Sequence, residues 1–199
     1  ALAATDADSV LTIGQLDAKN AVIAGADKVT LTKFNATSID ASAVTKDFTA
    51  TQDAKAATTV VGSATAKNTI VFTADTQDTA YTGGEGVDVV TLAQTTGNST
   101  TILGNGANTY RNMTLTNGTA VVIGGTGVDT ITVTATATAD TANVVIQSGD
   151  GNDVVTLALT GAANKETATV ELGAGDDKIT LGNATSATDV LSITGGDGT

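Results

Sequence analysis

Apolar residues recur along the chain in short clusters, separated by turns rich in glycine, aspartate and asparagine. Apolar and polar residues alternate within a cluster such as Thr130–Thr134, and this period of two is typical of a strand with one buried face. A second cluster, such as Val60–Val61 or Val144–Ile146, precedes each turn. The pattern therefore predicts two short strands and two turns in each unit. One unit can bury its apolar face only by stacking on neighbouring units.

The turns carry an aspartate or asparagine that recurs at intervals of 19 to 24 residues. The series is Asp8, Asp27, Asp47, Asn68, Asp88, Asn108, Asp129, Asp153 and Asp177. A period near twenty residues predicts an all-β chain, folded as a parallel β-solenoid or β-roll of about nine right-handed coils. Asp47 breaks the pattern, because Thr49 stands where the other turns have an apolar residue.

The coils after Asp129 lengthen to 24 residues, and we expect their inserts, near 135–141 and 161–167, on the edge opposite the aspartate turns. Short helices are expected only at 51–57 and 162–167. No linker divides the chain, so we predict one continuous domain, with degenerate turns in 1–80 and motif turns in 81–199. Its last residues, Gly195–Thr199, begin another copy of the motif, which we interpret as the C-terminal truncation of a longer protein.

Four turns share a nine-residue pattern of glycine, aspartate and a large apolar residue U, G-G-x-G-x-D-x-U-x. They are Gly83–Thr91, Gly124–Thr132, Ser148–Thr156 and Leu172–Thr180, of which the third begins with serine and the last has lost its first glycine. Glycines leave backbone carbonyl oxygens unshielded, the aspartate adds an anionic oxygen, and calcium takes six to eight oxygen ligands. Four copies in one register predict calcium binding. The alternative is a set of plain Gly-Asp turns, which also connect ordinary hairpins.

The composition narrows the function further. The net charge is −12 and Arg111 is the single arginine, which excludes a basic nucleic-acid interface and makes a surface for anionic lipids equally unsuitable. Cysteine and histidine are absent, so disulfides, thiolate metal sites and the usual general base are missing. No stretch is apolar enough for a transmembrane helix. We therefore expect neither an enzyme nor a membrane-inserted protein.

At these motifs the chain resembles the repeats-in-toxin (RTX) calcium-binding proteins, which Gram-negative bacteria export by type I secretion. The threonine- and alanine-rich spacers, with segments such as Ser38–Val44 and Val61–Ala66, make it more similar to the S-layer proteins of that group than to its cytolysins. The resemblance implies Ca²⁺ ions between successive turns along one edge of the roll. They would be held by motif aspartates and by carbonyl groups of the adjoining glycines.

The metal-binding positions that the resemblance implies are Gly84, Gly86, Asp88, Asn105, Asn108, Gly125, Gly127, Asp129, Gly149, Asp150, Gly151, Asp153, Gly173, Gly175 and Asp177. Asn108 departs from the motif, since an amide oxygen can bind calcium but brings no charge. We expect good sites from about Asp88 onward and mainly structural coils before it.

The leading hypothesis is a structural, calcium-stabilised segment of an exported bacterial surface-layer protein in the cell wall, located outside the cell and self-associating in a lattice. Regions outside this sequence would bind cell-surface polysaccharide. The alternative is a rod-like spacer of a large calcium-dependent RTX adhesin. A polysaccharide-cleaving β-helix would need paired carboxylates in a cleft, whereas here the acidic clusters lie in turns. A threonine-rich face could also bind ice, but unequal coil lengths argue against the regular array that ice binding needs.

Overall fold

The structure, a computed structural model, describes residues 2–4, 10–25, 27–53, 57–73, 76–93, 96–137, 141–161, 165–182, 184 and 186–198. Its regular elements are all β-strands. They are β1 (Leu2–Ala4), β2 (Val10–Ile13), β3 (Leu16–Asp17), β4 (Asn20–Gly25), β5 (Lys28–Asn35), β6 (Ser38–Val44), β7 (Phe48–Gln52), β8 (Thr58–Val61), β9 (Asn68–Phe72), β10 (Thr79–Gly84), β11 (Asp88–Leu92), β12 (Ser99–Gly104), β13 (Thr109–Leu115), β14 (Gly118–Thr126), β15 (Thr130–Ala135), β16 (Ala142–Asp150), β17 (Val154–Leu159), β18 (Glu166–Ala174), β19 (Lys178–Leu181) and β20 (Val190–Asp197).

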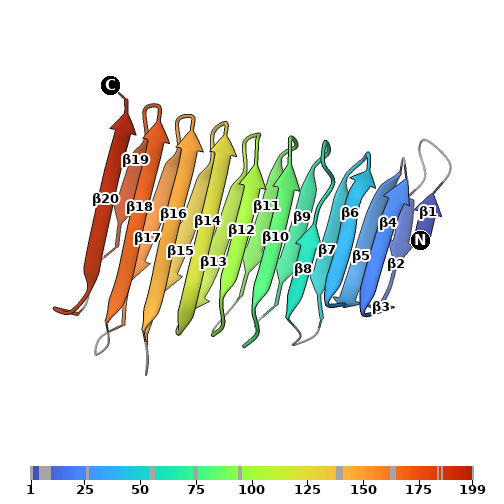
Figure 1. Cartoon of the computed structure of the whole chain (residues 1–199), viewed down its shortest axis with the longest axis horizontal. Coiled ribbons are helices and arrows are strands. Elements are labelled where there is room, and N and C mark those ends of the chain that lie inside the picture. Colours follow the sequence, from blue (N-terminus) through green and yellow to red (C-terminus); the bar gives the residue numbers. More distant parts are fainter. Residues whose placement is uncertain are drawn as a thin grey trace.

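The strands form two parallel sheets that stack coil upon coil from the N-terminus to the C-terminus (Figure 1). The first sheet has ten strands in the order β1-β4-β6-β8-β10-β12-β14-β16-β18-β20. The second runs β19-β17-β15-β13-β11-β9-β7-β5-β2, and β3 also pairs with β5. The chain alternates between the sheets, so the eight strand pairs from β4–β5 to β18–β19 each make one coil. The predicted parallel β-solenoid is confirmed, with about eight complete coils where about nine were expected.

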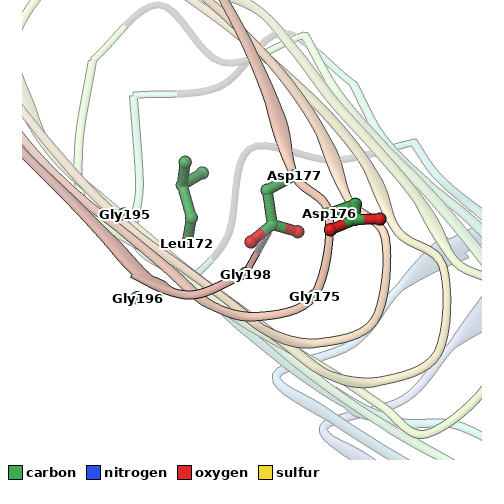
Figure 2. Close-up of a pocket in the computed structure, with 7 residues that line it drawn as sticks. All are labelled: Leu172, Gly175, Asp176, Asp177, Gly195, Gly196 and Gly198. Atoms are coloured by element: carbon green, nitrogen blue, oxygen red, sulfur yellow. The ribbon is translucent and has the colours of Figure 1, made fainter.

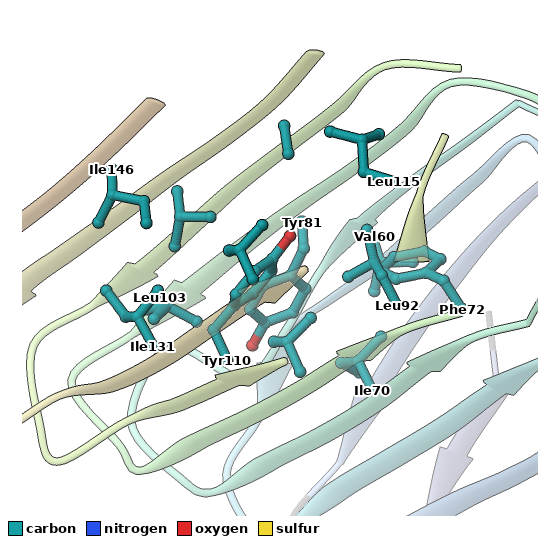
Figure 3. Close-up of a cluster of buried hydrophobic side chains, with 14 of the residues drawn as sticks. Val60, Ile70, Phe72, Tyr81, Leu92, Leu103, Tyr110, Leu115, Ile131 and Ile146 are labelled. Atoms are coloured by element: carbon teal, nitrogen blue, oxygen red, sulfur yellow. The ribbon is translucent and has the colours of Figure 1, made fainter. Parts of the chain in front are cut away.

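The core lies between the two sheets and is filled by the inward side chains of each strand. Burial alternates along strands such as β9 and β11, as the period-two pattern predicts. Figure 3 shows part of this core, where Tyr81, Tyr110 and Phe72 lie among aliphatic side chains such as Leu103. Phe34 and Phe48 are also fully buried, as expected for core fillers.

From Thr79 onward the coils differ in length at one edge only. From the first sheet to the second the chain takes nine residues in successive coils, as from Thr79 to Asp88 and from Ala168 to Asp177. The return is eleven residues from Asp88 to Ser99 but fifteen from Asp153 to Ala168. The longer inserts therefore lie opposite the motif turns, as predicted, although residues 138–140 and 162–164 lie outside the described part.

Because the extra residues leave the coil at that edge, the later pairs β14–β16 and β15–β17 keep one register along their whole length, whereas β4–β6, β5–β7 and β13–β15 each contain a register shift. Outward threonines such as Thr30, Thr49 and Thr69 stay aligned from coil to coil. The next position in this row is Val89, so the threonine row is not continuous along the sheet. The described residues contain no helix, and none that could cross a membrane. The two expected helices, 51–57 and 162–167, begin or end in strands β7 and β18, and the rest of each lies partly outside the described residues.

The predicted aspartate series is wrong in its first part. Asn68 is aligned with Phe48, and Phe48 with Val29, so these two apolar residues occupy the inward position assigned to Asp47 and Asp27. Val29 and Phe48 take this position because their apolar side chains are buried in the core there, whereas later coils bury a polar side chain at the same position. Asp8 lies outside the described residues.

Candidate metal centre

The motif turns line the edge where each strand of the first sheet passes into the second. β10 ends at Gly84 and β11 begins at Asp88, and β14 and β15 repeat this arrangement. The aspartate or asparagine of each turn points inward and stacks on its equivalent in the next coil. We call this row the ladder; it consists of Asn68, Asp88, Asn108, Asp129, Asp153 and Asp177.

A hydrogen bond joins each ladder residue to the next. The backbone N–H of one residue donates to the side-chain Oδ1 of its neighbour in the following coil. The N···O distances are 3.2 Å for Asn68–Asp88, 2.8 Å for Asp88–Asn108, 2.9 Å for Asn108–Asp129, 2.8 Å for Asp129–Asp153 and 2.9 Å for Asp153–Asp177. The ladder side chains therefore provide acceptors for the backbone N–H groups of the ladder residues, which lie where the turn passes into the strand.

The second carboxylate oxygens of Asp129 and Asp153 lack such a partner. Both side chains are fully buried, and their Oδ2 atoms have no hydrogen-bond partner among the described residues. Ser148 lies near Asp153, but its hydroxyl donates to the carbonyl oxygen of Leu172 at 2.6 Å. A buried carboxylate oxygen without a donor or a cation is costly, so these two positions require a partner.

Burial also changes the acidity of these groups. It raises the pKa of Asp129 to about 6, and the nearby charge of Asp153 adds to this effect. Burial likewise raises the pKa of Asp153, with smaller contributions from Asp177 and Asp150. Negative charge from successive turns therefore gathers around Asp153.

Glycine is required in these turns by close backbone approach. Gly149 has φ +102°, and a Cβ atom there would overlap the carbonyl oxygen of Gly125 in the preceding coil. Gly173 stands in the same relation to Gly149. The first glycine of the motif has a different role, because a Cβ on Gly124 would overlap Oδ2 of Asp129. This first glycine leaves space beside the carboxylate in the turns of Asp88 and Asp129, whereas Ser148 takes its place in the turn of Asp153.

The remaining predicted ligands lie in different surroundings. Asp150 is exposed on the outer side of its turn, and Asp177 is half-buried. Asn105 uses its amide to bond the Glu85 carboxylate, at 3.1 and 3.0 Å, on the outside of the solenoid. Asp88 and Asn108 are buried and fully hydrogen-bonded, as described below.

A pocket of about 200 Å³ opens between the last two motif turns. It is lined by Leu172, Gly175, Asp176, Asp177, Gly195, Gly196 and Gly198. Figure 2 shows the Asp177 carboxylate inside the loop of the turn. This space is thus lined by four glycines, one leucine and the two carboxylates of Asp176 and Asp177.

Two buried carboxylates lie outside the ladder: Asp27, which belongs to the aspartate series expected from the sequence, and Glu166, which sequence reasoning missed. Asp27 is buried in an early turn, and neither of its oxygens has a partner among the described residues. Glu166 lies at the opposite edge, where its Oε1 accepts from the backbone of Ala137 (2.6 Å) and Gly161 (2.9 Å) while its Oε2 is buried without a partner. Burial raises the pKa of Glu166. A Glu in a Gly- and Ala-rich insert gives no sequence signal of burial.

The donor set of the later turns fits a calcium ion. It offers buried carboxylate oxygens and glycine carbonyls, without nitrogen or sulfur ligands, and hard oxygen donors are what Ca²⁺ prefers. No three carboxylates are grouped closely enough among the described residues to bind a metal by themselves. Carbonyl oxygens would therefore have to complete the coordination.

The fold and this edge define a class of protein, a two-sheet parallel β-solenoid with a buried aspartate and asparagine ladder beside glycine-rich turns. No protein-family model matches the chain, and comparisons with curated proteins and with solved structures gave no match.

Proposed function

We propose that this chain is a calcium-stabilised structural segment of an exported bacterial surface-layer protein. The observation that carries the proposal is the pair of fully buried, unpartnered Oδ2 atoms of Asp129 and Asp153 in consecutive glycine turns. A calcium ion beside them supplies the positive charge that the turn lacks. The resemblance of the motifs to the RTX repeats of S-layer proteins supports the same function.

The proposed role of calcium is to fold the coils and hold them together. The carboxylates of Asp129, Asp153 and Asp177 would bind it, together with carbonyl groups of adjoining glycines. Because the unfolded chain has no such site, the free energy of binding becomes free energy of folding. Extracellular calcium modules bind at about 10⁻⁴–10⁻³ M, so a chain of this kind stays unfolded during export and folds outside the cell.

The surface agrees with a role in a lattice of identical copies. The net charge of −12 keeps the free chain soluble, and divalent ions that neutralise it allow copies to approach. Histidine is absent, and the carboxylates of Asp88, Asp129 and Asp153 are fully buried, away from any substrate in solution. We therefore assign the segment a structural and not an enzymatic role.

A rod-like spacer of a calcium-dependent adhesin is the second candidate. It is supported by the elongated stack of coils, in which the two chain ends lie far apart (Figure 1). In such a protein the segment would hold a binding tip away from the cell.

Two experiments test these proposals. Isothermal titration with calcium measures whether the chain binds the ion in the millimolar range or tighter; an absence of binding refutes both candidates. Electron microscopy of the producing cells then separates them. A two-dimensional lattice that is lost when calcium is chelated supports the surface-layer protein, and isolated fibres without a lattice support the adhesin.

A further inference from the structure

The ladder contains two kinds of turn that differ in how their polar groups are satisfied. In the turn of Asn108, the side-chain Nδ2 donates to the carbonyl oxygens of Gly104 and Gly106, both at 3.1 Å. These carbonyls stand four and two residues before the ladder residue. Here the amide nitrogen occupies the place that a cation would take between carbonyl groups of the turn.

Asn68 closes its turn in a similar way. Its Nδ2 donates to the carbonyl oxygens of Ser63 (3.0 Å) and Ala66 (3.3 Å), and its Oδ1 accepts from the backbone N–H of Ser63 at 2.6 Å. Ser63 in turn donates its hydroxyl to the carbonyl oxygen of Val44 in the preceding coil. This buried turn thus uses both ends of the amide.

Asp88 lies between these two asparagines, and its carboxylate is also satisfied. Oδ1 accepts from the backbone N–H (3.2 Å) and the side-chain Nδ2 (2.7 Å) of Asn68. Oδ2 accepts from the hydroxyl of Tyr81 at 2.9 Å. Tyr81 is aligned with Val60 and Thr101, so it brings a phenol hydroxyl to a position where neighbouring coils have other side chains. Three donors therefore surround the charge of Asp88.

Asp129 and Asp153 have no equivalent donors. A carboxylate carries no N–H group, so neither residue can bond the carbonyls that stand four and two residues before it, which are Gly125 and Gly127 in the turn of Asp129. Each uses Oδ1 to accept from the preceding ladder residue and leaves Oδ2 buried without a partner. The turn of Asp129 therefore has an unpartnered carboxylate oxygen and lacks the amide donors that bond the carbonyls of Gly104 and Gly106 in the turn of Asn108.

We propose that the ladder side chain decides how each turn is closed: Asn68, Asp88 and Asn108 form metal-free turns held by hydrogen bonds, and the row of calcium ions begins at Asp129. This inference rests on the proposed calcium binding, and it excludes Asp88, Asn105 and Asn108 from the ligands implied by the resemblance to RTX repeats. The solenoid then contains a part around Asn68, Asp88 and Asn108 that stays folded without calcium and a later part that needs it.

The consequence for stability is a boundary within one continuous fold. When calcium is removed, the coils around β9 and β11 keep their hydrogen bonds, whereas the turns that join β14 to β15 and β16 to β17 retain uncompensated buried charge. Solenoids lose structure coil by coil because each coil contacts only its neighbours. Loss of order should therefore start in the later coils and stop near Asn108.

Hydrogen–deuterium exchange of the whole chain, with EGTA and with calcium, tests the boundary. In EGTA we expect peptides from 60–92 to stay protected and peptides from 123–159 to exchange at least tenfold faster than with calcium. Equal acceleration in both regions overturns the proposal.

Substitutions at ladder positions test whether the ladder side chain decides how each turn is closed. Asp129→Asn supplies the missing amide donors, so we expect fewer calcium ions bound per chain and slower exchange of 123–132 in EGTA. Asn108→Asp removes donors, so exchange around 104–110 should become calcium-dependent. Asp88→Asn is the matched control, a charge removal in a metal-free turn that leaves the number of bound calcium ions unchanged.

The outcomes separate this inference from the proposed function. If the wild type binds no calcium at all, the proposed function fails and this inference fails with it. If the wild type binds calcium but Asp88→Asn removes an ion, or Asp129→Asn removes none, calcium binding stands and the assignment of the turns is wrong. Since Asp129→Asn and Asp88→Asn keep the shape of the side chain, the test does not depend on whether Asn108→Asp folds.

Discussion

The hydrogen bond from Tyr81 to Asp88 offers a direct test of how the metal-free turns are held. Tyr81→Phe removes the hydroxyl that donates to Oδ2 of Asp88 at 2.9 Å and keeps the aromatic ring in the core. Both residues are buried, with exposed fractions of 1% for Tyr81 and 0% for Asp88, so water cannot replace the lost donor. Burial and the Asp88 charge raise the pKa of Tyr81, so the hydroxyl keeps its proton and remains a donor.

A hydrogen bond to a charged group contributes about 1.5–3 kcal/mol, and we expect Tyr81→Phe to lower the free energy of unfolding by about that amount. Urea denaturation followed by circular dichroism at pH 7.5 measures the loss. Because Asp88 lies in a metal-free turn, the loss should be the same in EGTA and in calcium.

Tyr110→Phe is the matched control. Tyr110 is equally buried, but its hydroxyl has no hydrogen-bond partner among the described residues. Removing an unsatisfied buried hydroxyl is expected to be neutral or slightly stabilising. Equal losses in the two variants, or a loss below about 0.5 kcal/mol for Tyr81→Phe, would refute the reasoning.

Three further changes test other parts of the account. Gly149→Ala forces a side chain into φ +102° and into the backbone of the preceding coil. It should lower the free energy of unfolding by more than the roughly 1–2 kcal/mol of left-handed strain, with or without calcium. An unchanged midpoint in urea denaturation would contradict this. Glu166 has a raised pKa in the folded state, so its ionisation removes stability as pH rises from about 4.5 through that pKa. Glu166→Gln should therefore raise the melting temperature at pH 7.5 and change it little at pH 4, and an equal shift at both pH values would show that charge is not the cause. Asp153→Ala should abolish most of the increase in melting temperature that calcium produces in the wild type, whereas a full calcium response would remove Asp153 from the site.

The fold was predictable because the same signal occurs in every coil. Alternation in segments such as Thr130–Thr134 and a period near twenty residues together indicate a stacked parallel sheet, and the structure confirms it. The register of the first coils was not predictable. Asp27 precedes Val29 by the spacing of the motif, but the structure places Val29 itself on the inward row, and Phe48 displaces Asp47. Where a polar and an apolar residue lie close together in the sequence, the apolar one takes the inward position because it is more favourably buried. A loose repeat in the sequence does not show which of the two does so.

The candidate site was predictable in part. The glycine pattern placed Asp129 and Asp153 on one edge, and their burial in adjacent coils agrees with this. The role of Tyr81 could not be read from the sequence, because it stands seven residues before Asp88 in another strand, and only the passage between the sheets brings the two together. The same holds for Asn68, whose contact with Asp88 crosses from one coil to the next.

Thermal melting of the wild-type chain in EGTA and after addition of calcium tests the central claim most directly. Each site filled at ten times its dissociation constant adds about 1.4 kcal/mol to stability, so several sites should raise the melting temperature by many degrees at millimolar calcium. Magnesium at the same concentration should have little effect, because it demands tight octahedral geometry and gives up its water reluctantly. A chelated protein that melts at the same temperature as the calcium-loaded one would show that calcium does not hold this solenoid together.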